Sequence, residues 1–353
     1  ISFSRMSLWV DKYRPHDLSS LSYHKEQAST LSSLVQRDDF PHLLVYGPSG
    51  AGKKTRIRCI LRELYGPGAD VVSLQTMSFT TPSGKKLEIH TQSSNYHIEL
   101  TPADVGIYDR VIVQDVLKQM AQTSQIDIST QKSFKVVVLM GMDELSRDAQ
   151  HALRRTMEKY SGNCRLILCG ESLSRVIDPL RSRCMAIRVA APYDKEMESV
   201  ISMVCQKERF MMPPSVVKKI IEMSKGNTRR ALLSLEAMNP QVVMVKPNDE
   251  VHGIEWEKYL DETAMIMVKR QSAETLLDVR NRLYEIISRC IPPQTIFVYL
   301  VSALLPHSPC SIRGEILEMA AEYEHRLTRG QKAIFHLEAF VASFMHIFSS
   351  AKR

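Results

Sequence analysis

Residues 47–55 have the composition and spacing of a loop that binds phosphate groups. Its glycines let the backbone wrap closely around a chain of phosphates, so that successive N–H groups point at it, and Lys53 adds a positive charge. The apolar run at 42–46 predicts a buried strand before the loop, and 56–65 predicts a helix after it. This order of strand, loop and helix indicates nucleotide binding; the alternative is a chance glycine-rich turn.

One position of this loop departs from the pattern of an ATP-hydrolysing enzyme. The residue after the loop lysine usually offers a hydroxyl to Mg²⁺, and here it is Lys54, whose ammonium group cannot bind a cation. Thr55 carries a hydroxyl one residue later, but one step along a helix turns a side chain by about 100°. We therefore expect Mg²⁺ binding at this loop to be weak or absent.

The acidic residues of such an enzyme should follow a second buried strand, which the sequence predicts at 134–140. Counted back from the next helix, the expected positions of the acids are occupied by Met140 and Gly141. Asp143 and Glu144 come slightly later. Two hypotheses stay open: a site that hydrolyses little, and a self-sufficient ATPase in which Asp143 or Glu144 acts.

A basic cluster at 178–184 precedes another predicted strand and contains Arg181 and Arg183. Solvated surface charge is the default interpretation of such a cluster. Its place after a strand of a nucleotide domain suggests the alternative of an arginine offered to the phosphate of a neighbouring subunit.

The elements that must position these residues alternate between strand and helix over the first half of the chain, which predicts a three-layer α/β fold with a parallel sheet. Residues 9–15 are expected to form an extended arm that lies against an adenine base or packs on the domain. The predicted strands are 42–46, 71–77, 86–100, 134–140, 164–169 and 185–189, with a turn at 80–84, and the predicted helices are 26–36, 56–65, 109–122 and 148–160.

From residue 195 onward the sequence predicts helices alone, in two blocks separated by a linker at 239–253. We expect an α/β domain at 1–190, a helical lid at 191–240, and an all-α packing or oligomerisation domain at 254–353. The helices of the lid are predicted at 195–209, 214–225 and 227–238, and those of the last domain at 255–268, 273–290, 293–305, 310–326 and 330–348.

The composition of the 353 residues, with 44% hydrophobic and 24% charged, is typical of a globular protein of two or three domains. The net charge of +7 permits a nucleic-acid partner without requiring one. We see no apolar run of membrane-spanning length and no signal segment, and expect a cytosolic or nuclear protein with no membrane partner. The seven cysteines form no CxxC pair, so we expect reduced core residues and no metal site.

Taken together, these residues resemble the AAA+ clamp-loader family, and specifically the small subunits of replication factor C, over nearly the whole chain. The motifs that carry the resemblance are 9–15 for the adenine pocket, 47–55 for the Walker A loop, 149–160 for the signature helix, 182–184 for the Ser-Arg-Cys box, and 226–231 for the sensor-2 segment.

The departures from the family pattern are as informative as the matches. Lys54 replaces the metal-binding hydroxyl, Met140 and Gly141 replace the acidic pair, and Glu171 stands where a polar sensor-1 residue is expected. The Ser-Arg-Cys box with Arg183 is intact. This combination resembles the subunit at the end of the clamp-loader spiral, which donates an arginine finger to its neighbour although its own site is not completed by a partner.

The resemblance implies a hetero-pentamer of replication factor C subunits in the nucleus. The complex uses ATP to open the sliding clamp, PCNA, and to load it on primer-template DNA for replication and repair. This chain would bind ATP or ADP, hydrolyse little, and supply Arg183 as a catalytic arginine finger in trans. The remaining alternative is a scaffold whose loop binds nothing.

The resemblance also implies positions for the binding residues. Val10 and Ser22 would contact the adenine end, and Arg229 would reach the nucleotide from the lid. Arg110 is the first candidate for DNA binding, and the clamp-facing surface would lie within 95–122. Arg154 and Arg155 are weaker DNA candidates because a structural salt bridge is about as plausible. The phosphate-binding positions are Gly47, Pro48, Ser49, Gly50, Ala51, Gly52, Lys53, Lys54 and Thr55.

Overall fold

The computed structural model describes residues 7–37, 39–80, 86–122, 134–238, 251 and 253–351. The chain forms two compact units, Ile1–Val251 and His252–Arg353. Most of the predicted turn at 80–84 and most of the predicted linker at 239–253 lie outside the described residues. Residues 1–6 lie outside them as well. The boundaries of the three predicted domains stay predictions. The structure divides into two units, and the first unit includes both the expected α/β domain and the expected lid.

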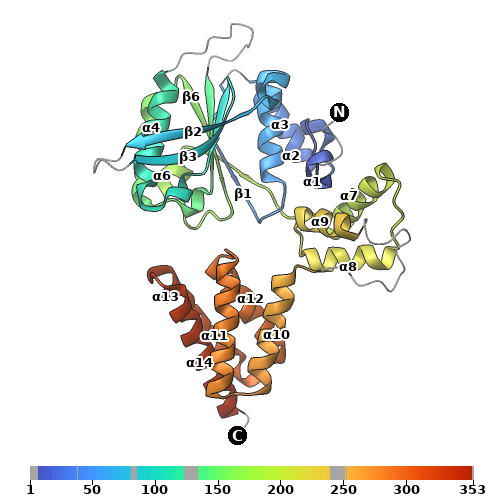
Figure 1. Cartoon of the computed structure of the whole chain (residues 1–353). Helices are drawn as coiled ribbons and strands as arrows, with labels where there is room; N and C mark the ends of the chain where they lie inside the picture. The colour runs from blue at the N-terminus through green and yellow to red at the C-terminus, as the bar shows by residue number, and fades with distance from the viewer. Residues whose placement is uncertain are drawn as a thin grey trace. The chain divides into compact units, whose positions relative to one another are not determined.

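A seven-stranded sheet forms the centre of the first unit (Figure 1). The strand order is β2-β3-β4-β5-β6-β1-β7; the last five are parallel, whereas β2 and β3 form an antiparallel edge. The strands are β1 (Leu43–Tyr46), β2 (Ser73–Thr80), β3 (Lys86–Ser93), β4 (His97–Leu100), β5 (Lys135–Met140), β6 (Cys164–Gly170) and β7 (Met185–Arg188).

The prediction of one long strand at 86–100 is wrong, because the chain turns between β3 and β4. The Ser94 hydroxyl accepts the backbone N–H groups of Tyr96 and His97, at 3.2 and 3.0 Å. These bonds satisfy the backbone of a tight reversal. As a result β4 runs parallel to β5, and its last residues reach the edge of the sheet where the phosphate loop lies.

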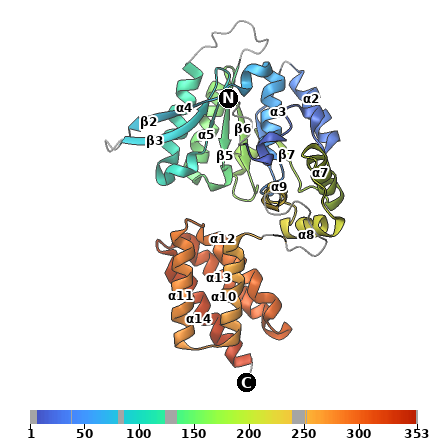
Figure 2. The ribbon, with the colours of Figure 1, turned by 45° about the vertical axis from the view of Figure 1, so that its right-hand side comes forward.

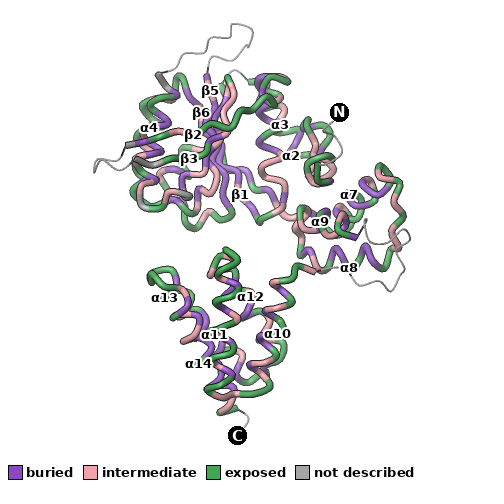
Figure 3. Tube along the Cα trace, viewed as in Figure 1, coloured by how far each residue is buried: buried purple, intermediate pink, exposed green. Residues whose placement is uncertain are grey.

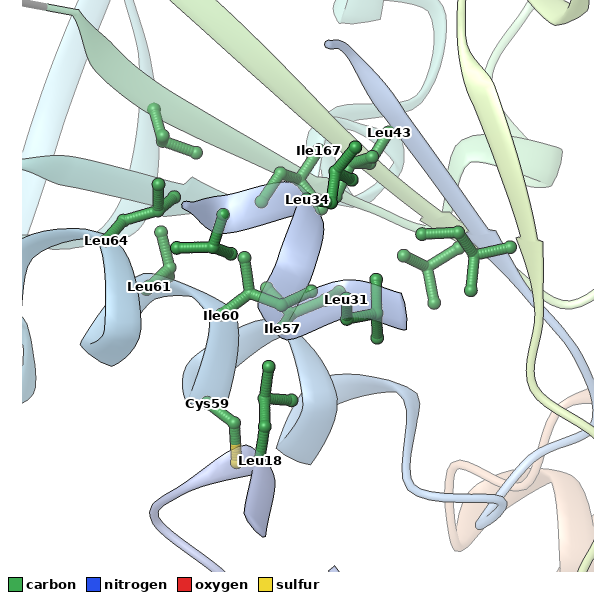
Figure 4. Packing of buried hydrophobic residues seen from close by; sticks show 14 of the residues in the cluster. Leu18, Leu31, Leu34, Leu43, Ile57, Cys59, Ile60, Leu61, Leu64 and Ile167 are labelled. Atoms are coloured by element: carbon green, nitrogen blue, oxygen red, sulfur yellow. The ribbon is translucent and has the colours of Figure 1, made fainter. Parts of the chain in front are cut away.

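Alternating side chains of the sheet enter two separate cores. Val136 and Val138 of β5 pack with α2 and α3, while Val137 and Leu139 pack with α4 and α5. Figure 4 shows the first core and Figure 2 the helices on the two sides of the sheet. The predicted three-layer α/β fold is confirmed. These helices are α2 (Lys25–Val35), α3 (Lys53–Tyr65), α4 (Asp109–Gln122), α5 (Arg147–Tyr160) and the short α6 (Asp178–Arg181).

Three helices form the lid, and the N-terminal arm completes their core. The arm is a short helix, α1 (Trp9–Lys12), so the predicted extended conformation is wrong. Its Trp9 side chain is buried among lid residues, and its backbone N–H donates to Glu236 at 3.0 Å. The arm is thereby attached to the lid. The lid helices are α7 (Asp194–Lys207), α8 (Pro214–Ser224) and α9 (Thr228–Met238).

The second unit is a helical bundle whose buried stripes are visible in Figure 3. Its last helix is long and apolar enough to cross a membrane by composition, so the expectation that no run reaches that length is wrong. In the structure Phe340 and Phe344 of this helix are fully buried in the bundle core. The helices are α10 (Glu255–Lys269), α11 (Ala273–Ser288), α12 (Pro293–Leu304), α13 (Arg313–Arg329) and α14 (Ala333–Ala351).

The seven cysteines are all free, and most are core residues as expected. Cys290 and Cys310 are exposed at helix ends of the second unit, which corrects the expectation for these two. Within the residues the structure describes, no three His, Cys, Asp or Glu side chains gather in an arrangement that could hold a metal ion.

Candidate nucleotide-binding site

A pocket of about 490 Å³ opens where the phosphate loop, the arm, the strand ends and the lid meet. Its volume falls within the range of small-molecule sites. The arm contributes Val10 and Tyr13, the ends of β5 and β6 contribute Met140 and Cys169, and the lid contributes Arg229. Residues separated widely in sequence therefore enclose one cavity at the carboxyl edge of the parallel strands, where α/β sheets bind ligands.

The phosphate loop has a conformation that favours glycine at three of its positions, Gly47, Gly50 and Gly52. Gly47 has a φ of +152°, and a Cβ there would lie 1.9 Å from the Val189 carbonyl oxygen. Gly50 has a φ of +73°, and a Cβ there would lie 1.8 Å from Oδ1 of Asn227 in the lid. The loop is thus held between β7 and the lid, and it ends at the N-terminus of α3, whose dipole favours anions.

Lys53 is the first residue of α3 and folds back over the loop. Its ammonium group donates to the carbonyl oxygens of Gly47 at 2.6 Å and Pro48 at 3.0 Å. An ammonium group has three donors, so it can exchange such bonds for bonds to phosphate oxygens. This is the position that the loop motif requires of its lysine.

Lys54 forms an ion pair with Glu99 of β4. Both side chains are largely covered, with 29% and 14% of their surfaces exposed. The sequence analysis did not single out Glu99, since 45 residues separate it from Lys54 and no local pattern links the two.

The ends of β5 and β6 carry the other acids of the site. Met140 and Gly141, the residues predicted to occupy the positions of the acidic pair, line the pocket. Asp143 and Glu144 also line it, and both oxygens of the Asp143 carboxylate lie 3.2 Å from the Glu171 backbone N–H that donates to them. Asp143 thus joins the two strand ends.

Cys169 of β6 lines the same pocket, and its side chain is buried. Burial raises its pKa to about 11, so the thiol is neutral at physiological pH.

Tyr23 and Arg56 also line the pocket and support the loop, and the sequence offered no signal for either. The Tyr23 hydroxyl donates to the Ala51 carbonyl oxygen at 2.9 Å. The buried Arg56 guanidinium lies over the Tyr23 ring and donates to the carbonyl oxygens of Tyr23 and Ala51, at 3.1 and 3.4 Å. These contacts fix the backbone that would cradle the phosphates.

The structure brings most of the predicted nucleotide-binding positions together around one pocket. Gly47, Pro48 and Ala51 belong to the loop but do not line the cavity; Ala51 is buried. The positions that line it are Val10, Ser22, Ser49, Gly50, Gly52, Lys53, Lys54, Thr55 and Arg229.

Arg183 lies outside this pocket, between α6 and β7. Its guanidinium pairs with Glu158 of α5 at 2.7 Å and donates to the Pro179 carbonyl oxygen at 2.8 Å. About a third of the side chain is exposed. The two contacts hold the arginine against α5 with one edge open to solvent.

The predicted DNA-binding residues lie on α4 and α5, which pack against each other. Arg110 is exposed at the start of α4, and Arg155 is exposed on α5. Arg154 is half-buried and pairs with Glu158 at 3.5 Å, so it has the salt bridge that the sequence analysis weighed against DNA binding. With His151 and Glu158, Arg154 and Arg155 line a second, smaller pocket on α5.

Comparison with known protein families divides the chain into three matched segments. Residues 1–176 match the Rad17 P-loop domain, 199–239 match the RCF1/5-like AAA+ ATPase lid domain, and 256–352 match the C-terminal domain of replication factor C subunit 3. The P-loop AAA+ fold with a lid and a helical C-terminal domain, predicted from the sequence, is confirmed, and this fold implies nucleotide binding.

Comparison with individual proteins extends the match along nearly the whole chain. Replication factor C subunit 3 of Bos taurus and of Homo sapiens are each 54% identical, over 97% of this chain and 96% of theirs. Replication factor C subunit 5 of Neurospora crassa is 48% identical over 97% of both chains. The solved Thermotoga maritima RuvB motor aligns with a TM-score of 0.47 at 14% identity, over 71% of this chain and 79% of that one, too slight a likeness to carry a conclusion. The chain belongs to the replication factor C family, in the branch whose members are named subunit 3 in mammals and subunit 5 in Neurospora.

Proposed function

We propose that this chain is the subunit of a clamp loader that holds a nucleotide, hydrolyses little of it, and supplies Arg183 to the site of a neighbouring subunit. The observation that carries the proposal is the composition of the pocket. It combines a phosphate loop and Lys53 with Met140 and Gly141 at the strand end where acids are needed. Such a pocket can bind phosphates through amides and ammonium groups, but has weak means of activating water.

The place of Arg183 supports its use in trans. Its guanidinium lies outside the pocket of its own chain, and Glu158 and the Pro179 carbonyl orient it at the surface. An arginine supplied by a neighbour can raise phosphoryl-transfer rates by about 10³ to 10⁵. A chain with little turnover of its own can therefore control turnover next to it.

We propose ATP or ADP as the nucleotide, with the adenine near Val10 and Ser22 and Arg229 reaching it from the lid. The proposed partners are the other replication factor C subunits of a hetero-pentamer, the sliding clamp PCNA, and primer-template DNA in the nucleus. Arg110 and Arg155 are exposed cations suited to phosphate contacts. Such contacts are independent of base sequence and weaken as salt is raised.

The nucleotide content and ATP turnover of the purified full chain test this proposal. We expect bound nucleotide that Lys53→Ala removes, and a turnover near background that Asp143→Asn and Glu144→Gln leave unchanged. A substantial turnover abolished by either acid substitution would instead favour the self-sufficient ATPase. Protein that binds no nucleotide would favour the scaffold.

A further inference from the structure

The ion pair between Lys54 and Glu99 lies where AAA+ enzymes hold Mg²⁺. Lys54 is the second residue of α3, directly after the loop lysine, and Glu99 reaches it from β4. The two residues come from different layers of the fold, and both are largely covered. The loop therefore carries a cation of its own, anchored by a carboxylate of the sheet.

The residues at this position do not fit a magnesium ion. Mg²⁺ requires oxygen ligands in a nearly octahedral shell, and P-loop proteins hold it with a loop hydroxyl and a strand-end carboxylate. Here the hydroxyl is replaced by the ammonium of Lys54, and the strand end carries Met140 and Gly141. The Asp143 carboxylate accepts the Glu171 N–H, and Glu99 is paired with Lys54.

We infer that the Lys54 ammonium, held by Glu99, replaces the metal, so that this chain binds nucleoside polyphosphates without Mg²⁺. An ammonium group has three N–H donors; the pair with Glu99 uses one, and the others can reach phosphate oxygens. Lys54 neutralises phosphate charge, and Glu99 acts as a positioning residue. This inference rests on the proposed nucleotide binding and adds how the site neutralises the phosphate charge.

Glu99 also explains how a second lysine is tolerated beside Lys53. Two neighbouring ammonium groups repel each other when they are poorly solvated. The carboxylate of Glu99 offsets one of these charges and fixes its direction, since it approaches from the sheet rather than from solvent. A fixed charge of this kind needs little reorganisation when a charged ligand arrives.

Equilibrium dialysis of radiolabelled ADP against the full chain, once with Mg²⁺ and once with EDTA, tests the inference. We expect the Kd of the wild-type chain to differ by less than about threefold between the two buffers. A larger rise of the Kd in EDTA would overturn the inference. No binding in either buffer would instead overturn the proposed nucleotide binding.

Substitutions of Lys54 separate its charge from its effect on folding. Lys54→Thr should raise the Kd in EDTA by about tenfold or more, and added Mg²⁺ should recover part of the loss. Lys54→Arg should keep metal-independent binding, because it keeps the charge. Lys219→Thr, at an exposed lysine of α8, is the matched control and should bind as the wild type in both buffers.

The double variant tests the role of Glu99. In Lys54→Thr the Glu99 carboxylate loses its partner and becomes an uncompensated negative charge beside the phosphate loop. Adding Glu99→Gln to Lys54→Thr should therefore lower the Kd in EDTA again, by several-fold, relative to Lys54→Thr alone. If the double variant binds no better than Lys54→Thr, Glu99 is not coupled to the nucleotide and that part of the inference is wrong.

Discussion

His42 lies just before β1 and is neutral in the folded protein. Its Nδ1 accepts the backbone N–H of Leu166 at 3.0 Å. Burial, together with the nearby Arg165 guanidinium, lowers the pKa of His42 from 6.5 to about 4. Protonation would break the hydrogen bond and place a second cation beside Arg165, so the folded state resists it.

The stability of the first unit should therefore fall as the pH falls from about 6.5 to 4. In this window the unfolded chain binds a proton on His42 that the folded chain does not, which favours unfolding. After allowance for partial exposure, we expect a loss of about 1–2 kcal/mol. Urea unfolding of wild type and His42→Gln should show a difference in stability that changes between pH 7 and 4.5. A constant difference would contradict the assignment.

Asp109 joins the beginnings of two helices, α4 and α5. It is buried, and its carboxylate accepts the backbone N–H and the hydroxyl of Ser146 at 2.7 and 3.0 Å, as well as the N–H of Arg110 at 2.7 Å. Ser146 in turn caps α5 by accepting the N–H of Ala149. One carboxylate therefore sets how the two helices with the candidate DNA contacts begin.

Asp109→Ala should lower the free energy of unfolding by about 1–3 kcal/mol, because it removes three hydrogen bonds accepted by a buried carboxylate. Thermal unfolding measures this loss. Glu198→Ala, at an exposed site of α7, serves as the control and should change stability by less than about 0.5 kcal/mol. Equal effects of the two substitutions would show that the Asp109 contacts contribute nothing.

The contact between the phosphate loop and the lid depends on Gly50. Gly50→Ala would force a strained φ and push Asn227 away from the loop. We expect a loss of about 1–3 kcal/mol in stability and a weaker affinity for ADP, measured by thermal unfolding and by dialysis. Gly162→Ala, where a Cβ would meet nothing within 4 Å, should affect neither. An unchanged ADP affinity in Gly50→Ala would show that the lid contact is irrelevant to binding.

Elements with a local signature could be predicted from the sequence, and contacts between distant elements could not. The strand, loop and helix of residues 42–65 were predicted because hydrophobic period and glycine spacing are local properties. The departure of Lys54 from the pattern of the phosphate loop could likewise be identified from the sequence. Its partner Glu99 was not predicted, because it lies in a stretch interpreted as one long strand and the pair joins distant elements. The short α1 helix was not predicted either, because it packs on a lid surface that no local pattern indicates.

At the scale of the whole chain, the molecule consists of an α/β unit with its lid and a helical bundle. The order of these parts was predicted, because the change from alternating strands and helices to helices alone is a long-range pattern. Composition alone does not distinguish α14 from a membrane helix, because a buried bundle helix has the same apolar character; its packing in the bundle core is visible only in the structure.

The proposed division of labour between Lys53 and Arg183 is a property of the assembled complex. The test is clamp- and DNA-stimulated ATP turnover by the reconstituted five-subunit complex with Arg183→Ala, Lys53→Ala or, as a matched control, Arg181→Ala. We expect Arg183→Ala to lower turnover sharply, since removal of an arginine finger slows the site that it serves by about 10³-fold or more. Lys53→Ala and Arg181→Ala should change turnover little. A large loss with Lys53→Ala and none with Arg183→Ala would mean that this chain hydrolyses ATP itself, against the function proposed for it.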